Sequence, residues 1–101
     1  MAQLVSIARL EEVPPGQSRV IKIGEFGIAL FNIEGTFYAL ENSCPHSGGP
    51  LGRGELQGKI VTCPWHEWRF DVTTGLSIDY PDEQAKRFEV KIEGGEIKVL
   101  L

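Results

Sequence analysis

Apolar and polar residues alternate along several stretches of this chain, and the alternation predicts β-strands. The clearest case lies at the C-terminal end, where the alternation over residues 86–92 resumes over 97–101 after the Gly94-Gly95 pair. A period of two places one row of side chains on a core and the other in water, and paired glycines suit a tight hairpin turn. The same reasoning predicts further strands over residues 17–23, 26–33, 36–40 and 59–62.

The rest of the chain shows little regular structure. Residues 8–13, which end at Pro14-Pro15-Gly16, hold a weak helical signal that predicts a single turn. Residues 42–54 contain two prolines and four glycines and cannot run as a regular strand. Glycines in such a segment let the backbone approach a bound group without a clashing Cβ. The pattern as a whole predicts an all-β protein with a close-fitting loop in its middle.

Composition and charge narrow the class of protein. With 101 residues, of which 42% are hydrophobic, the chain is expected to form one domain over residues 1–101 with a small core. The formal net charge of −4 argues against nucleic acid or an anionic membrane surface as a partner. No secretory signal and no apolar run of roughly 18 residues is visible, so no membrane span is expected. The acidic residues form either a solvated surface or a field that steers a basic partner.

The chain contains two cysteines and two histidines, and all four fall in two short segments. Cys44 and His46 form a Cys-x-His pair, and after sixteen further residues Cys63 and His66 form a Cys-x-x-His pair. A thiolate and an imidazole in each segment allow a mixed Cys2His2 metal site. Two cysteines in a reducing compartment are more often metal ligands than a disulfide. These four residues are therefore the candidate ligands.

The spacing of these ligands resembles the signature of Rieske [2Fe–2S] proteins, in which two histidines replace two cysteines on one iron. Residues 46–51, His-Ser-Gly-Gly-Pro-Leu, look like the family's His-x-Gly-x-x-Leu. Residues 68–75 are similar to the aromatic, Asp and Thr-Gly run that follows the second ligand pair. The resemblance implies an antiparallel β-sandwich base with a small cluster-binding subdomain, over about residues 42–75, formed by two ligand loops.

The resemblance also implies the ligand set and the role of the protein. Cys44 and Cys63 would bind one iron of a single [2Fe–2S] cluster, and His46 and His66 the other. Anionic thiolates favour Fe(III) and neutral imidazoles favour Fe(II), so the added electron should settle on the histidine-ligated iron. Rieske-type oxygenases add a mononuclear iron held by two histidines and a carboxylate. Both histidines here are used by the cluster, so the chain is expected to carry electrons for a partner enzyme.

Several positions depart from the high-potential members of this family. Those members join the two ligand loops by a disulfide, and the corresponding positions here are Gly49 and Trp65. They also carry a Ser and a Tyr whose hydroxyls donate to the cluster, and the corresponding positions here are Trp68 and Phe70. A hydrogen-bond donor stabilises the more negative, reduced cluster. Without these donors, the midpoint potential is expected near the low end of the Rieske range, at about −150 mV.

The sequence also supports expectations for other residues near the ligands. Glu67 stands where the family commonly has Gly, and its carboxylate points either to solvent or toward the cluster. Pro81 resembles the proline of a third loop that covers the cluster, with a simple turn as the alternative. Trp65, Trp68 and Phe70 could shield the cluster from water or dock a partner, and ordinary packing is the alternative. Packing is favoured for Phe70, whereas Trp65 is the aromatic residue expected on the surface.

Two partner classes and one other kind of site stay open. The first is a soluble ferredoxin that passes electrons from a flavin reductase to a Rieske-type oxygenase, and the second is the small subunit of a nitrite reductase. The intact ligand set favours an active redox role in either case. The other kind of site is structural zinc, although zinc modules usually pair Cys with Cys and His with His. Respiratory Rieske proteins carry an N-terminal anchor that this chain lacks, so a cytoplasmic location is expected.

Overall fold

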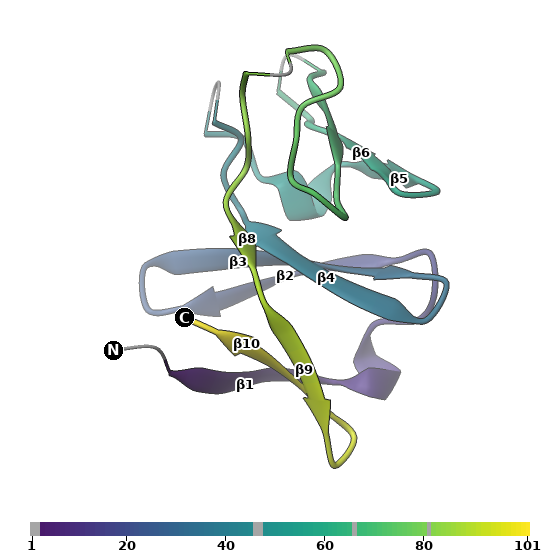
Figure 1. The fold of residues 1–101 in the computed structure, drawn as a ribbon, viewed down its shortest axis with the longest axis vertical. Helices are drawn as coiled ribbons and strands as arrows, with labels where there is room; N and C mark the ends of the chain where they lie inside the picture. Colours follow the sequence, from purple (N-terminus) through teal and green to yellow (C-terminus); the bar gives the residue numbers. More distant parts are fainter. Residues whose placement is uncertain (1–2, 46–47, 66, 81) are drawn as a thin grey trace.

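The computed structural model describes residues 3–45, 48–65, 67–80 and 82–101, and strands dominate this part of the chain. They form three antiparallel sheets that lie one above another along the longest axis of the molecule (Figure 1). The lower sheet contains β1 (Leu4–Arg9), β10 (Glu96–Leu100) and β9 (Val90–Glu93) in that order. The middle sheet contains β2 (Ser18–Ile23), β3 (Phe26–Ile33), β4 (Thr36–Glu41) and β8 (Arg87–Phe88). The upper sheet contains β5 (Glu55–Gln57), β6 (Ile60–Thr62) and β7 (Arg69–Asp71).

This arrangement confirms the predicted all-β, antiparallel class and its division into a base and a smaller upper part. The predicted strands over 17–23, 26–33 and 36–40 correspond to β2, β3 and β4, which pair as two consecutive hairpins. Both central residues of the β3–β4 turn, Glu34 and Gly35, have positive φ angles, of 52° and 93°. Positive φ at both positions is the backbone geometry whose twist matches that of paired strands.

Strand β3 is buried on both of its faces. Ile28 and Leu30 belong to a lower core against the lower sheet, whereas Ala29 and Phe31 belong to an upper core beneath the ligand loops. All four side chains have no exposed surface. A strand sandwiched in this way reads as a continuous apolar run, which explains why residues 28–31 show no alternation.

The predicted strand over residues 86–92 is wrong as a single element. Glu89 separates β8 from β9, because Phe88 pairs with Ala39 of the middle sheet and Val90 pairs with Val99 of the lower sheet. One run of alternating residues therefore crosses from one sheet to the other. Phe88 is buried as expected, but Ile92 lies near the hairpin end and is 46% exposed.

Other short elements were not predicted from the sequence. Strand β1 pairs with β10, and the three-residue strands β5 and β7 flank β6.

The helical segments are short. The predicted helical turn is a 3-10 helix, η1 (Leu10–Glu12), and a second one, η2 (Leu51–Arg53), lies in the glycine-rich segment. None of the helices in the described ranges has the length and apolar content that crossing a bilayer requires.

Candidate metal centre

The first predicted ligand loop begins just after β4 and closes on itself. The backbone N–H of Cys44 donates to the carbonyl of Gly49 at 2.8 Å, and the N–H of Gly48 donates to the carbonyl of Cys44 at 2.7 Å. The Cys44 residue is only 2% exposed. Its predicted ligand partner, His46, lies outside the described residues. The loop therefore holds its cysteine at the boundary of the upper core.

The second predicted ligand loop follows β6 and is closed in a similar way. The backbone N–H of Cys63 donates to the carbonyl of Trp68 at 2.7 Å, which joins the ends of a six-residue loop. Cys63 has no exposed surface, whereas Trp65 is 52% exposed. The loop therefore turns its thiol inward and an indole outward, as expected for Trp65. His66, the fourth predicted ligand, lies outside the described residues.

Gly49 is the point at which the two loops meet. A Cβ atom built on Gly49 would lie 2.8 Å from Cys63 Sγ, 3.0 Å from Trp65 Cγ and 3.1 Å from Trp65 Cβ. The positions that carry the disulfide in high-potential relatives are therefore neighbours here, and an indole packs against a glycine in its place. Any side chain at position 49 would compete with the sulfur of Cys63 for space.

The two candidate ligands that the structure describes suit a metal group bound by thiolates. Cys44 and Cys63 are both buried, neither is in a disulfide, and both belong to the upper core. Among the described residues, no three Cys, His, Asp or Glu side chains gather into a metal site, and both histidines lie outside that part of the chain. Buried thiols on two adjoining, closed loops suit soft, sulfur-liganded groups.

Glu67 adopts an unusual backbone conformation beside these ligands. Its φ angle is 58°, in the left-handed region that favours glycine, and its side chain is exposed. The side chain therefore contacts solvent, and whether its carboxylate also lies near the cluster stays a prediction. The left-handed backbone also gives a physical reason for the glycine that is common at this position in the family.

The aromatic residues after the second loop divide between core and surface. Phe70 has no exposed surface and packs in the upper core, as predicted. Trp68 is half-buried, and its ring stacks on that of Tyr80 with centroids 4.0 Å apart and an interplanar angle of 27°. Neither Trp68 nor Phe70 carries a hydroxyl group that could donate to a cluster.

A third loop, described over residues 77–80 and 82–83, lies against the second ligand loop, and its contacts were not predicted. Asp79 accepts hydrogen bonds from the backbone N–H of Arg69 at 3.0 Å and from its guanidinium at 2.7 Å. These hydrogen bonds from Arg69 lower the pKa of the Asp79 carboxyl from its ordinary value. The ten-residue separation of this pair leaves no local sequence signal. Pro81, which resembles the family's loop proline, lies outside the described residues.

The Asp-x-Thr-Thr-Gly run of the motif forms a turn at the end of β7. Asp71 Oδ1 accepts hydrogen bonds from the backbone N–H of Thr73 at 2.9 Å and from its hydroxyl at 2.6 Å, and Lys59 Nζ lies 3.4 Å from Oδ2. Burial raises the pKa of Asp71, but the hydrogen bonds from Thr73 and the charge of Lys59 together leave it lowered. Asp71 therefore stabilises the turn that follows β7.

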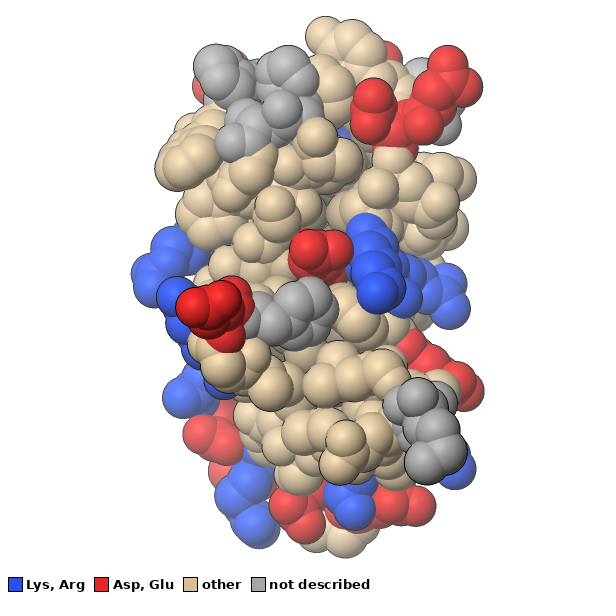
Figure 2. Space-filling model, turned by 90° about the vertical axis from the view of Figure 1, so that its left-hand side faces the viewer, with Lys and Arg blue, Asp and Glu red and all other residues tan. Residues whose placement is uncertain are grey.

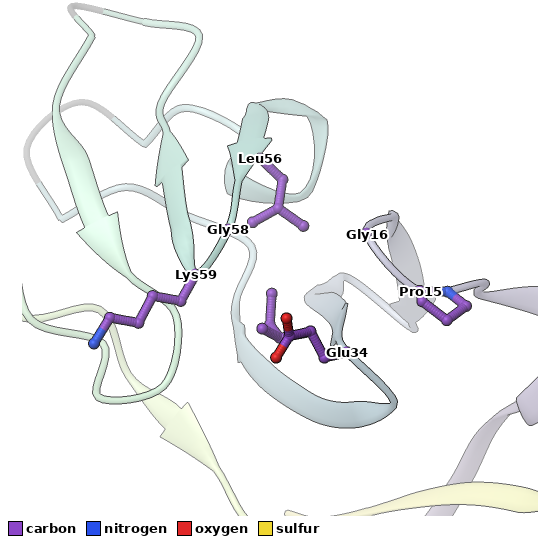
Figure 3. Close-up of a pocket in the computed structure, with 7 residues that line it drawn as sticks. Pro15, Gly16, Glu34, Leu56, Gly58 and Lys59 are labelled. Carbon is purple, nitrogen blue, oxygen red and sulfur yellow. The ribbon is translucent and has the colours of Figure 1, made fainter.

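A hollow between the base and the upper part lies elsewhere. It has a volume of about 340 Å³, and Figure 3 shows Leu56 approaching it from the upper part while Pro15 and Glu34 line it from the base. Of the candidate ligands, the two that the structure describes, Cys44 and Cys63, do not line this hollow.

Comparisons with known proteins agree with this site. Residues 3–98 match the model of the Rieske [2Fe-2S] domain family. The ferredoxin component of the naphthalene 1,2-dioxygenase/salicylate 5-hydroxylase systems of Ralstonia sp. is 37% identical over 90 residues, which cover 88% of this chain and 86% of the relative. The ferredoxin in a complex of reduced oxygenase and oxidized ferredoxin of carbazole 1,9a-dioxygenase superposes with a TM-score of 0.87 at 30% identity, over 95% of this chain and 91% of that one.

A nitrite reductase subunit has the same fold. A protein assigned as the small subunit of an NADH-dependent nitrite reductase from Mycobacterium tuberculosis superposes with a TM-score of 0.87, over 100% of this chain and 96% of that one. At 21% identity, this likeness shows the fold alone. The cofactor that the family match assigns is one [2Fe–2S] cluster of the Rieske type, not zinc. With its two buried thiols on adjoining loops and a match over residues 3–98, this chain belongs to the Rieske [2Fe–2S] domain family.

Proposed function

We propose that this protein is the ferredoxin component of an oxygenase system and carries one electron at a time from a reductase to a terminal oxygenase. The observation that carries the proposal is the pair of buried thiols on two adjoining loops at one end of an otherwise structural β-scaffold. The relatives named as ferredoxin components, which match over nearly the whole chain, support the oxygenase class. Catalysis then belongs to the partner.

We propose that Cys44 and Cys63 hold one iron and that His46 and His66 hold the other. When bound, the [2Fe–2S] cluster supplies a centre that accepts and releases a single electron. The residues of the chain have separate tasks around it. The closed loops orient the two thiols, Gly49 leaves room beside the sulfur of Cys63, and the upper core excludes water from below.

The negative charge of the surface around the ligand loops supports a positively charged partner protein. Acidic side chains gather at the upper end of the molecule, which carries both ligand loops (Figure 2). The second ligand loop and the third loop contribute Glu67, Asp82 and Glu83, all exposed, whereas the charge of Asp79 is paired with that of Arg69. Negative charge near the ligand loops, where electrons would leave the protein, accelerates encounters with a positively charged partner. Added salt screens this attraction. Trp65 offers an apolar contact at the same end.

The subdomain boundaries and the location of the protein are also proposals. We propose a single domain over residues 1–101, in which the cluster-binding subdomain spans about residues 42–75. This range contains both loops and the upper sheet. We further propose a cytoplasmic location, which fits two cysteines that form no disulfide. Cell fractionation with an antibody against the protein tests the location.

Spectroscopy and a transfer experiment test the function. Anaerobically purified protein reduced with dithionite should give an EPR signal whose average g is clearly below that of all-cysteine [2Fe–2S] ferredoxins. Rapid mixing of the reduced protein with the oxidised oxygenase of a naphthalene 1,2-dioxygenase system should reoxidise it. Absence of iron, with zinc in its place, would contradict the cofactor. Reoxidation only by the sirohaem subunit of a nitrite reductase would favour that alternative partner.

A further inference from the structure

Four side chains form a clasp between the second ligand loop and the third loop: Trp68, Arg69, Asp79 and Tyr80. We propose that this clasp holds the second ligand loop against the cluster and limits the access of water, so that Asp79 and Tyr80 are positioning residues for the redox centre. The proposal rests on the proposed ligand roles of Cys63 and His66, and it does not depend on which partner receives the electron.

The first half of the clasp fixes the backbone directly after the second ligand loop. Asp79 Oδ2 accepts hydrogen bonds from the backbone N–H of Arg69 at 3.0 Å and from Nε at 3.3 Å, and Oδ1 accepts one from Nη2 at 2.7 Å. In return, the backbone N–H of Ile78 donates to the carbonyl of Arg69 at 2.8 Å. Both backbone polar groups of Arg69 therefore bind to the third loop. A bidentate guanidinium–carboxylate contact fixes the relative orientation of the two side chains as well as the distance between them.

The second half of the clasp connects an aromatic stack to a ligand. The ring of Trp68 stacks on Tyr80 at 4.0 Å, and the carbonyl of Trp68 accepts the hydrogen bond from Cys63 N–H that closes the ligand loop. Tyr80 is itself anchored, because its N–H donates at 3.0 Å to the hydroxyl of Ser77, which is 4% exposed. A continuous series of contacts thus leads from buried Ser77 through Tyr80 and Trp68 to Cys63.

Trp68 packs against the upper core, but Arg69, Asp79 and Tyr80 lie outside both hydrophobic cores. The side chains of Arg69 and Asp79 are 52% and 31% exposed, and Tyr80 is 49% exposed. An open hollow of about 310 Å³ is lined by Trp68, Asp79, Tyr80, Asp82 and Glu83. Removing an exposed clasp residue leaves no core cavity, so the fold should survive while the ligand loop loosens. These contacts are therefore better suited to holding the ligand loop in place than to stabilising the whole domain.

A loosened loop has a predictable effect on the cofactor. Water that approaches the cluster solvates its charge, and the reduced state carries one more negative charge than the oxidised state. Loss of the clasp should therefore raise the midpoint potential and let a chelator reach the iron sooner. Outer contacts that orient metal ligands typically change metal affinity by about 10–100-fold when they are removed.

Paired variants of the holoprotein separate the clasp from general effects. Tyr80→Leu removes the stack, whereas Tyr80→Phe keeps it. The double variant Arg69→Gln/Asp79→Asn removes both charges together and leaves the net charge unchanged. Glu93→Gln/Lys98→Gln is the matched control, because it removes an ion pair in the lower sheet and also leaves the net charge unchanged. For each variant, the rate of cluster loss to a chelator, the midpoint potential and the unfolding temperature are measured.

We expect cluster loss to become about tenfold faster and the potential to rise in Tyr80→Leu and in the double variant. Tyr80→Phe and Glu93→Gln/Lys98→Gln should match the wild type in both the rate of cluster loss and the potential. Wild-type rates and potentials in both clasp variants would overturn the proposal. So would faster cluster loss at an unchanged potential with an unfolding temperature lowered in proportion, because that is a purely structural effect. A wild-type protein without iron would instead contradict the ligand assignment on which the clasp depends.

Discussion

At the scale of single residues, the metal centre depends on the absence of a side chain at Gly49 and on the strained backbone of Glu67. Gly49 leaves space beside Cys63 Sγ, and Glu67 holds a left-handed backbone directly after the predicted ligand His66. Neither residue is a ligand, and each acts through the shape it imposes on a ligand loop. Both effects can be measured by single substitutions.

Gly49→Ala should lower the iron content of the purified protein. The added methyl group would lie 2.8 Å from Cys63 Sγ, which is too close for a real Cβ contact, so the sulfur must move. Gly58→Ala is the control, because nothing lies within 4 Å of a Cβ at that position and only its positive φ is strained. The measurement is iron per chain together with visible absorbance. Full iron content in Gly49→Ala would show that the loop adjusts freely.

Glu67→Gly should stabilise the protein relative to Glu67→Ala, by roughly 0.5–1 kcal/mol. Both changes remove the carboxylate, so their difference isolates the backbone, which has a φ angle of 58°. A left-handed conformation costs a residue with a Cβ about 1–2 kcal/mol, and the greater freedom of unfolded glycine offsets part of that gain. Denaturant unfolding of the two holoproteins measures the difference. Equal stabilities would mean that the loop relaxes around alanine.

At the scale of elements, β3 and the turn after β7 determine what lies beneath the ligand loops. Strand β3 divides its side chains between two cores, and only the upper core contains Cys44 and Cys63. The turn that begins at Asp71 directs the chain from the upper sheet toward the third loop. Substitutions in β3 and in the turn after β7 should therefore differ in how much they change the unfolding free energy and the retention of the cluster.

Replacements on the two faces of β3 should separate fold stability from cluster retention. Leu30→Ala, in the lower core, should cost about 2–5 kcal/mol of unfolding free energy, and Phe31→Ala, in the upper core, about 3–5 kcal/mol. Only Phe31→Ala should also speed cluster loss to a chelator, because Phe31 packs in the core that contains both thiols. Denaturant unfolding and chelator kinetics give the two readouts. Equal rates of cluster loss in both variants would contradict this division.

Asp71→Ala should destabilise the protein by about 1–3 kcal/mol, because it leaves the donors of Thr73 without their acceptor. Asp71→Asn should cost less, since an amide oxygen still accepts hydrogen bonds. The folded state lowers the pKa of Asp71, so its contribution is present above the unfolded pKa of about 4 and is lost as pH falls through the lower folded value. The unfolding free energy of the wild type should therefore fall more steeply in acid than that of Asp71→Asn. Parallel pH profiles would exclude this role.

At the scale of the whole molecule, the ligand loops and the chain termini occupy different regions. Gln3 and Leu101 lie together, because the backbone N–H of Gln3 donates to the carbonyl of Leu101 at 3.1 Å. Figure 1 shows these ends of β1 and β10 at about mid-height on one side of the molecule, whereas the ligand loops lie at the top of its longest axis, which measures 37 Å. A tag at either terminus should therefore leave the redox end accessible to a partner.

The midpoint potential should lie near the low end of the Rieske range, at about −150 mV. Neither Trp68 nor Phe70 supplies a hydroxyl donor, and the acidic residues at the loop end disfavour the added negative charge. A redox titration monitored by EPR measures the midpoint. A value well above zero would mean that other donors stabilise the reduced cluster.

Sequence reasoning located the longer elements more reliably than the short ones. The predicted strand over 26–33 has the same bounds as β3, because a long apolar run between turn residues leaves few alternatives. The strands β5 and β7 have three residues each, too few for a period to show, although β6, which is equally short, falls within the predicted strand over 59–62. The split between β8 and β9 was also hidden, because both halves alternate in the same way and only their different partners separate them.

The sequence by itself determined the class of fold, the family and the four candidate ligands, because these depend on local alternation and on ligand spacing, which are written along the chain. Only the tertiary structure decided how the ligand loops are supported. The contact of Gly49 with Cys63 and Trp65, and the clasp of Arg69 and Trp68 with Asp79 and Tyr80, join residues ten or more positions apart. Such pairs have no periodic signal, since they come together only when three sheets stack and bring separate loops to one end of the molecule.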